Sequence, residues 1–302
     1  MRHIAALIHF NRLHIRWRFF SRLPVWTMAG VITILSSGFS ALSNAQIEEG
    51  LKLYIFDNGQ IRGLAPELFN FTAEEVSETS FIVTSYLIVH PQGTLLWDAG
   101  AVPDHDLPAD GSEYAEGATV VSQSLTSQLA AIGVASTDID YFVMSHLHSD
   151  HNGNANDFAD ATWIVQEADR NMMFSGEPVR VMNASQFSAL ETATTLILHN
   201  EDYDVFGDGS VKILSAPGHT PGHQVLLVHL PDYGPVLLAG DLYHYPQEIE
   251  TGRTPTFEYD PATTAISRAR IQQVLRDTGA QMWISHDIAT HARLNFSPAF
   301  YH

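Results

Sequence analysis

Short runs of β-branched and aromatic residues, separated by turn residues, are the main pattern of the chain after residue 50. Residues 80–89 form the clearest run, and His90-Pro91-Gln92-Gly93 separates it from a second run at residues 94–97, which is typical of a hairpin. Residues 161–165 predict a buried strand. Further strands are expected at residues 51–56, followed by a turn at Asp57-Asn58-Gly59, and at residues 138–144, 211–214, 224–230, 235–239 and 281–284.

Helical spacing of apolar residues occurs in two places between these runs. Residues 120–132 show it and stop at Gly133, and residues 262–278 predict an amphipathic helix. We expect Arg268, Arg270 and Arg276 to lie on the exposed face of that second helix. Residues 188–199 predict a short helix and a strand, residues 203–214 a hairpin with its turn at Gly207-Asp208-Gly209, and residues 101–118 a surface loop beside a cleft.

Residues 167–183 are less regular and contain Met172, Met173, Phe174 and Met182. Adaptable apolar side chains in such a stretch would either line a pocket for an acyl chain or pack into the core or a lid. The pattern favours packing.

The predicted strands fall into two groups, each accompanied by helices. This order predicts an α/β fold in which two β-sheets pack face to face and helices cover their outer faces. The chain shows no linker and no short repeat, so we expect a single domain over residues 46–302.

The first 45 residues differ from the rest. A basic segment up to Arg22 precedes an apolar run at residues 23–35, and small residues then end in Ser43-Asn44-Ala45, as a signal peptidase requires. The apolar run is short for a membrane span of about 20 residues. We expect residues 1–45 to be a signal peptide, cleaved after Ala45 and followed by export to the periplasm or the medium. An uncleaved membrane anchor is the alternative.

Charge and cysteine content narrow the classes of function. Five of the 15 basic residues are Arg in the first 45 positions, which leaves 10 bases against 34 acids afterwards, a formal charge of −24. Such a surface repels nucleic acid and anionic lipid, so neither is an expected partner. The chain has no Cys, and any metal site must therefore be built from His and carboxylates.

The highest density of possible metal ligands in the chain lies in the stretch Ser145-His146-Leu147-His148-Ser149-Asp150-His151. Four possible metal ligands fall within six residues, and imidazole with carboxylate suits zinc, manganese, iron or cobalt. The stretch predicts a loop at the C-terminal end of a strand, where successive side chains converge on one point. A His-rich surface turn without metal is the alternative. Three further candidate ligands also follow predicted strands: His219, Asp241 and His286.

The combination of His146-x-His148-x-Asp150-His151 with these three later residues resembles the metallo-β-lactamase fold superfamily, over residues 86–286 or so. The resemblance implies an αββα sandwich with two metals at one edge. Seven ligands are too many for one tetrahedral zinc, so we expect two divalent metal ions, zinc foremost. The resemblance implies that the first metal is held by His146, His148 and His219, the second by Asp150, His151 and His286, and that Asp241 bridges both.

Two such metals imply hydrolysis. In the family the nucleophile is a hydroxide shared between the two cations, whose separation of about 3.5–4 Å pulls its pKa towards neutrality. Asp150 would lie beside this hydroxide, orient it and pass a proton to the leaving oxygen.

Within the superfamily the chain is most similar to the N-acyl-homoserine lactonases. The residues that carry this likeness are 86–100, 139–148 and 206–224. The resemblance implies opening of the lactone ring of N-acyl-homoserine lactones, which is quorum quenching. The expected partner is thus a small amphiphilic lactone, and an acidic exported enzyme does not repel an uncharged molecule.

One position departs from the lactonase pattern. Those enzymes commonly have a Tyr three residues after the bridging Asp, with its hydroxyl directed at the substrate carbonyl. In this chain the position is His244, and Tyr243 precedes it. A His donates the same hydrogen bond, so we assign the oxyanion role to His244, with Tyr243 in reserve. A structural role for His244 is the alternative.

Other functions remain open on the same residues. An organophosphate triesterase resembling methyl parathion hydrolase, or a general lactonase or esterase, would use the same metals. The bridging Asp241 disfavours a β-lactamase, and the scarcity of bases disfavours a thioesterase resembling glyoxalase II. A non-catalytic exported protein that sequesters metal or a signal would bind metal without turnover.

The remaining His have no partner that the sequence identifies. His223 lies in a Pro-Gly turn and is expected to be structural. Surface or capping roles are expected for His90, His105, His199, His229, His291 and His302.

Overall fold

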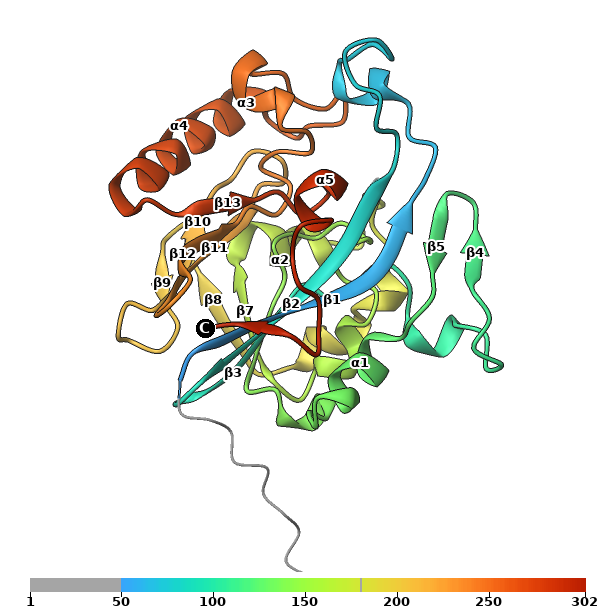
Figure 1. The fold of residues 1–302 in the computed structure, drawn as a ribbon, viewed down its shortest axis with the longest axis vertical. Coiled ribbons are helices and arrows are strands. Elements are labelled where there is room, and N and C mark those ends of the chain that lie inside the picture. The colour runs from blue at the N-terminus through green and yellow to red at the C-terminus, as the bar shows by residue number, and fades with distance from the viewer. Residues whose placement is uncertain (1–49, 180) are drawn as a thin grey trace, which may run out of the picture. The chain divides into compact units, whose positions relative to one another are not determined.

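The computed structural model describes residues 50–179 and 181–302, which belong to one compact unit with two β-sheets (Figure 1). The first sheet has nine strands in the order β4-β5-β1-β2-β3-β6-β7-β8, with β14 paired to β1. β2 and β3 pair antiparallel, as the predicted hairpin requires, and they lie in the middle of this order. Its strands are β1 (Lys52–Ile61), β2 (Phe81–His90), β3 (Gly93–Trp97), β4 (Tyr114–Glu116), β5 (Thr119–Val121), β6 (Tyr141–Val143), β7 (Thr162–Gln166), β8 (Thr195–Leu198) and β14 (Phe300–Tyr301).

The second sheet has five strands in the order β13-β12-β11-β10-β9. All its pairs are antiparallel except β12 with β13, which run parallel. Its strands are β9 (Tyr203–Asp204), β10 (Val211–Ser215), β11 (Gln224–Leu230), β12 (Gly234–Leu238) and β13 (Gln281–Trp283), and the helices of the unit are α1 (Leu125–Ala131), α2 (Glu167–Met173), α3 (Gln247–Thr251), α4 (Pro261–Thr278) and α5 (Ile288–His291).

Alternate residues of the central strands face different layers, which explains why these strands are apolar on both faces. On β2, Tyr86 and Ile88 enter the core between the sheets, while Leu87 and Val89 face the outer layer that contains α1. The second sheet shows the same alternation, and α4 covers its outer face (Figure 1). The predicted αββα sandwich is therefore confirmed.

The turn predicted at Asp57-Asn58-Gly59 is wrong. β1 continues through these residues, and its pairing with β2 shifts register between Asp57 and Gln60. The Asn58 side chain points inward and donates a hydrogen bond to the Ser85 hydroxyl. An irregularity in the strand thus accommodates polar residues that resemble a turn in the sequence.

The helix predicted at residues 120–132 is shorter than expected. It begins at Leu125, and the Ser124 side chain caps it by accepting a hydrogen bond from the Ser127 N–H. The apolar residues before it belong to β5, which pairs with both β1 and β4. Cross-strand pairing therefore takes precedence over helical spacing in this segment.

The predicted helix at residues 262–278 is confirmed as α4, but one exposed position was wrong. Arg268 is buried, because its guanidinium pairs with the buried Glu248. Arg270 and Arg276 are exposed as predicted.

The predicted signal peptide, residues 1–45, lies outside the described residues. Among the helices that the structure does describe, none has the length and apolar character needed to cross a membrane.

Candidate metal centre

The predicted metal loop follows β6 and is fixed by the segment that follows β3. The Ser145 N–H donates to Asp98 Oδ1 at 2.6 Å, and the Gly153 N–H donates to the Gly100 carbonyl at 2.6 Å. A Cβ atom on Gly153 would lie 2.6 Å from the Val102 nitrogen, so only glycine permits this contact. The two segments therefore hold the loop in one conformation.

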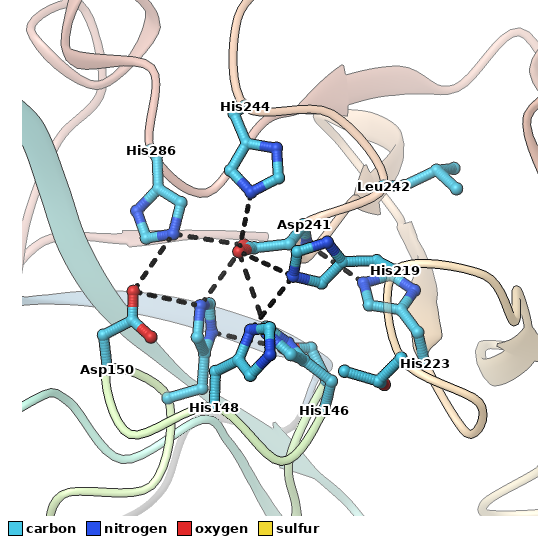
Figure 2. A network of polar contacts seen from close by, with 12 residues as sticks. His146, His148, Asp150, His219, His223, Asp241, Leu242, His244 and His286 are labelled. Carbon is cyan, nitrogen blue, oxygen red and sulfur yellow. Dashed lines mark hydrogen bonds and ion pairs between the residues drawn. The ribbon is translucent and has the colours of Figure 1, made fainter. Parts of the chain in front are cut away.

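The first group of candidate ligands is His146, His148, His219 and Asp241, all buried. His148 Nδ1 lies 2.9 Å from His146 Nε2 and 3.0 Å from His219 Nε2. Asp241 Oδ2 is 3.7 Å from His146 Nε2 and 3.5 Å from His219 Nε2. The four side chains point at a common centre, although they come from the ends of β6, β10 and β12 (Figure 2).

The second group is Asp150, His151 and His286. Asp150 Oδ2 lies 3.5 Å from His286 Nε2 and 3.8 Å from His151 Nε2. Asp241 turns its other oxygen, Oδ1, to this group, at 3.2 Å from His151 Nε2 and 3.1 Å from His286 Nε2. Asp241 thus directs one oxygen to each group, as expected of a bridging carboxylate.

The donor set fits two divalent cations. Burial lowers the pKa of both His148 and His219 to about 3, so these rings are neutral and offer lone pairs. His151 Nε2 and Asp241 Oδ1 are buried and have no hydrogen-bond partner. A buried polar atom without a partner destabilises the folded state, and a bound cation would supply that partner. All seven predicted ligands are therefore brought together in an arrangement with room for two ions.

The ring nitrogens that face away from the two groups are also held. His151 Nδ1 lies 3.0 Å from Asp98 Oδ2, and His219 Nδ1 lies 3.0 Å from Glu258 Oε2. His286 Nδ1 lies 2.9 Å from the Ile82 carbonyl oxygen. Partners of this kind fix the tautomer and orientation of metal-binding imidazoles.

Neither acidic partner, Asp98 or Glu258, was predicted from the sequence to belong to the site. Both act through residues more than 30 positions away, so no local pattern marks them.

His223 has the structural role that was predicted. Its Nδ1 donates to the Ala216 carbonyl at 3.1 Å, and its Nε2 accepts from the Asp241 N–H at 3.0 Å. The ring thereby fixes the backbone of the bridging residue.

The surface position expected for His291 is wrong, although its Nδ1 does lie 3.0 Å from the carbonyl oxygen of Asp287 at the start of α5. The side chain is buried, and its Nε2 lies 2.8 Å from the Tyr86 hydroxyl. His90 is buried as well, but it keeps a capping role, since its Nδ1 accepts from the Gln92 N–H in the following turn.

A pocket of about 270 Å³ opens onto the two ligand groups. Its polar floor includes Asp150, Asp241, His244 and His286. Ala101 and Thr119 also line it, which places the predicted loop and its neighbouring strand beside the cleft. The rest of the wall is mostly apolar and contains Ile61, Leu64, Leu68, Phe69, Phe81, Val181 and Phe257.

The four predicted Met and Phe residues do not line this pocket. Met173 is buried in the outer core of the first sheet, and Met172, Phe174 and Met182 pack against that core. The packing role that the pattern favoured is confirmed, and other segments supply the apolar residues that line the pocket.

His244 lies where the sequence placed it, beside the bridging carboxylate. Its Nε2 is 3.1 Å from Asp241 Oδ2, and Figure 2 shows the ring next to that of His286. Burial alone would lower the pKa of His244, but the carboxylates of Asp241 and Glu248 raise it to about 10.

Tyr243, the second candidate for the hydrogen-bond donor, does not face the pocket. Its ring is buried in the outer core of the second sheet, and its hydroxyl accepts a hydrogen bond from Gln272 Nε2 at 3.3 Å. Tyr243 packs into this core together with Leu242, whereas His244 lines the pocket.

Comparison with known proteins places this site in a recognised group. Residues 79–283 match the Metallo-beta-lactamase superfamily. The N-acyl homoserine lactonase AttM of Azorhizobium caulinodans is 27% identical over 266 residues, covering 83% of this chain and 98% of the relative. An N-acyl homoserine lactonase of Bacillus sp is 29% identical over 218 residues, covering 68% and 81%.

Solved structures show the same fold. An N-acyl homoserine lactone hydrolase, with the product N-hexanoyl-L-homoserine at its catalytic metal centre, superimposes with a TM-score of 0.68 at 24% identity, covering 83% of this chain and 99% of that one. AidC, a dizinc quorum-quenching lactonase, gives a TM-score of 0.59 at 18% identity, covering 84% and 94%.

Proposed function

This chain belongs to the metallo-β-lactamase superfamily, and from that premise we propose that it opens the lactone ring of N-acyl-homoserine lactones. One combination of features carries the proposal. The two ligand groups share Asp241, and the pocket that opens onto them has a mostly apolar wall. The ligand groups suit ester hydrolysis, and the walls suit the acyl chain of an amphiphilic substrate. The lactonase relatives support the same substrate class.

Seven side chains of this chain would hold the two ions, as assigned above. Divalent ions bound there would act as Lewis acids and would lower the pKa of a water molecule towards 7. We propose zinc as the ion in both positions, because five imidazoles and two carboxylates, one of them placed between the two groups, suit it.

Asp150 is the proposed proton carrier. It is the most exposed of the seven candidate ligands, with 16% of its side chain accessible, whereas the side chain of His286 is 1% exposed. It also lines the pocket. A carboxylate in this position orients a water molecule against the lactone carbonyl and returns the proton to the leaving ring oxygen.

His244 is the proposed donor to the carbonyl oxygen. Its Nε2 lies at the pocket floor beside Asp241, where negative charge develops as the carbonyl is attacked. A donor already fixed at that point stabilises the transition state more than the ground state.

The cellular setting belongs to the proposal too. We propose that residues 1–45 direct export and are removed after Ala45, which would bring the enzyme into contact with diffusible signals. The acidic surface does not oppose an uncharged lactone.

The test is a substrate screen on purified protein. Metal content is measured by inductively coupled plasma mass spectrometry, and hydrolysis of C4 to C12 acyl-homoserine lactones is followed by pH-stat. A phosphotriester and a chromogenic cephalosporin serve as competing substrates. We expect about two zinc ions per chain and preferential lactone opening.

Faster turnover of the phosphotriester would replace the lactonase assignment with a triesterase. Bound metal without turnover of any of these substrates would favour a sequestering protein.

A further inference from the structure

The segment that follows the bridging Asp241 contains a buried acid that the reaction scheme does not use. Glu248, on α3, is 0% exposed. Its Oε1 lies 3.7 Å from His244 Nδ1, one helical turn away in sequence. His244 Nδ1 is itself buried and has no hydrogen-bond partner. The two polar groups therefore face one another, and Glu248 Oε1 also accepts a long hydrogen bond from the Tyr245 N–H at 3.4 Å.

Arg268 fixes the other oxygen of the same carboxylate. This residue comes from α4 and pairs with Glu248 Oε2 at 2.5 Å. Its Nε donates to the Leu242 carbonyl at 2.7 Å, and its Nη1 donates to the Arg253 carbonyl at 2.6 Å. The guanidinium also lies 4.4 Å from the centre of the Tyr243 ring. Arg268 thus holds both ends of the segment that carries His244.

A buried ion pair of this kind is seldom explained by stability alone. Desolvating two charges costs about as much as their attraction returns, and apolar replacements are often neutral or stabilising. In this pair the second carboxylate oxygen is directed at the pocket residue His244, and the orientation that it imposes there explains the pair better.

We propose that Glu248 is the positioning residue for His244 and that Arg268 holds Glu248 in place. The carboxylate fixes the Nδ1 side of the imidazole, which keeps Nε2 directed at the pocket. Aromatic rings complete the setting, with Phe69 at 5.0 Å and Phe81 at 6.0 Å from His244 between ring centres. The kinetic effect of this inference rests on the proposed function. The contact between Glu248 and His244 does not depend on it.

The test is a double-mutant cycle that combines Glu248→Gln with His244→Tyr. The Tyr side chain keeps an aromatic ring and a hydrogen-bond donor at this position. It has no atom equivalent to Nδ1, so Glu248 cannot orient it. We expect Glu248→Gln alone to lower kcat on an acyl-homoserine lactone about tenfold or more, with KM changed less than about twofold. In the His244→Tyr background the same substitution should change kcat less than about twofold.

Thermal unfolding of the same four proteins measures the contact without turnover. Glu248→Gln should lower Tm by at least about 2 °C more in the His244 chain than in the His244→Tyr background. If wild type opens no lactone, the proposed function fails, and this difference in Tm still decides whether the two residues interact.

Two further variants keep the experiment interpretable. Glu248→Asp retains the charge that Arg268 needs but withdraws it from His244, so it should fold and still lose kcat. Glu250→Gln, an exposed position on the same helix, should leave kcat and Tm unchanged. Equal losses of kcat and Tm from Glu248→Gln in both backgrounds would overturn the proposal.

Discussion

At the scale of single residues, Asp241 is the side chain on which both ligand groups depend. Its two oxygens face different groups, so Asp241→Asn replaces one carboxylate oxygen by an amide that does not bind a cation. We expect the variant to retain less than one metal per chain and to lose activity in parallel. Metal analysis after gel filtration, with activity measured on the same fractions, is the check. Two retained ions together with full activity would contradict the bridging role.

Glu258 offers a finer test, because it contacts the centre only through His219. Replacing it with Gln leaves an acceptor for Nδ1 but removes the charge that increases the basicity of the ring. We expect metal affinity to fall by about 10–100-fold while the fold is retained. Competition with a zinc chelator of known affinity measures this. Glu191→Gln, at an exposed position outside the centre, is the matched control and should show wild-type affinity.

The contrast between these residues shows what the sequence could reveal of the site. The grouping of the seven candidate ligands was predictable, because a dense motif and three strand ends mark them. Glu258, Asp98 and Glu248 were not, because each acts through a contact that exists only after folding. Tyr243 was misassigned for a related reason, since the direction of a side chain in an irregular segment depends on packing that no periodicity encodes.

At the scale of elements, α2 ties together two loops that carry ligands. Asp169, in its first turn, accepts hydrogen bonds from the Gly222 N–H at 2.5 Å, the Thr220 hydroxyl at 2.8 Å and the Leu147 N–H at 3.2 Å. Burial raises the pKa of Asp169 to about 6, although these donors oppose the shift.

This raised pKa predicts a pH-dependent stability. The native state holds the Asp169 proton more tightly than the unfolded chain does, so the contribution is most favourable below pH 3.8 and is lost as pH rises to about 6. We expect the unfolding free energy of wild type, relative to Asp169→Asn, to fall by about 2–3 kcal/mol between pH 4 and pH 7. Urea unfolding with chelator present measures this difference. Parallel pH profiles would show that Asp169 titrates normally.

Strands and helices were predicted well where burial determines their pattern of apolar residues. They were predicted poorly where pairing between strands determines the secondary structure. The apolar strands in both sheets were found, because two-sided burial leaves continuous apolar runs. Val120 and Val121 of β5 were assigned to a helix because they continue the apolar spacing of α1, and pairing with β1 and β4 distinguishes them. The exposed face of α4 was misjudged at Arg268, since an amphipathic pattern cannot show that an Arg has a buried partner.

At the scale of the whole molecule, the candidate metal centre joins the two sheets. The loop after β6 of the first sheet supplies His146, His148, Asp150 and His151, while strands of the second sheet lead to His219, Asp241 and His286. Bound ions would therefore link both halves of the sandwich at one edge. Without them, the buried His151 Nε2 and Asp241 Oδ1 have no hydrogen-bond partner.

This arrangement predicts that metal removal destabilises the entire fold and not just the site. A ligand that binds only the native state at 100 times its dissociation constant contributes about 2.7 kcal/mol, so two ions contribute about 5 kcal/mol. For a domain of this size we expect chelation to lower Tm by about 10 °C or more. Differential scanning calorimetry before and after dialysis against chelator measures the shift, and zinc should restore it. Asp241→Asn should show a smaller response, because it lacks the shared ligand. An unchanged Tm in the chelated wild type would mean that the sheets are held by their core alone and that the ions serve only the reaction.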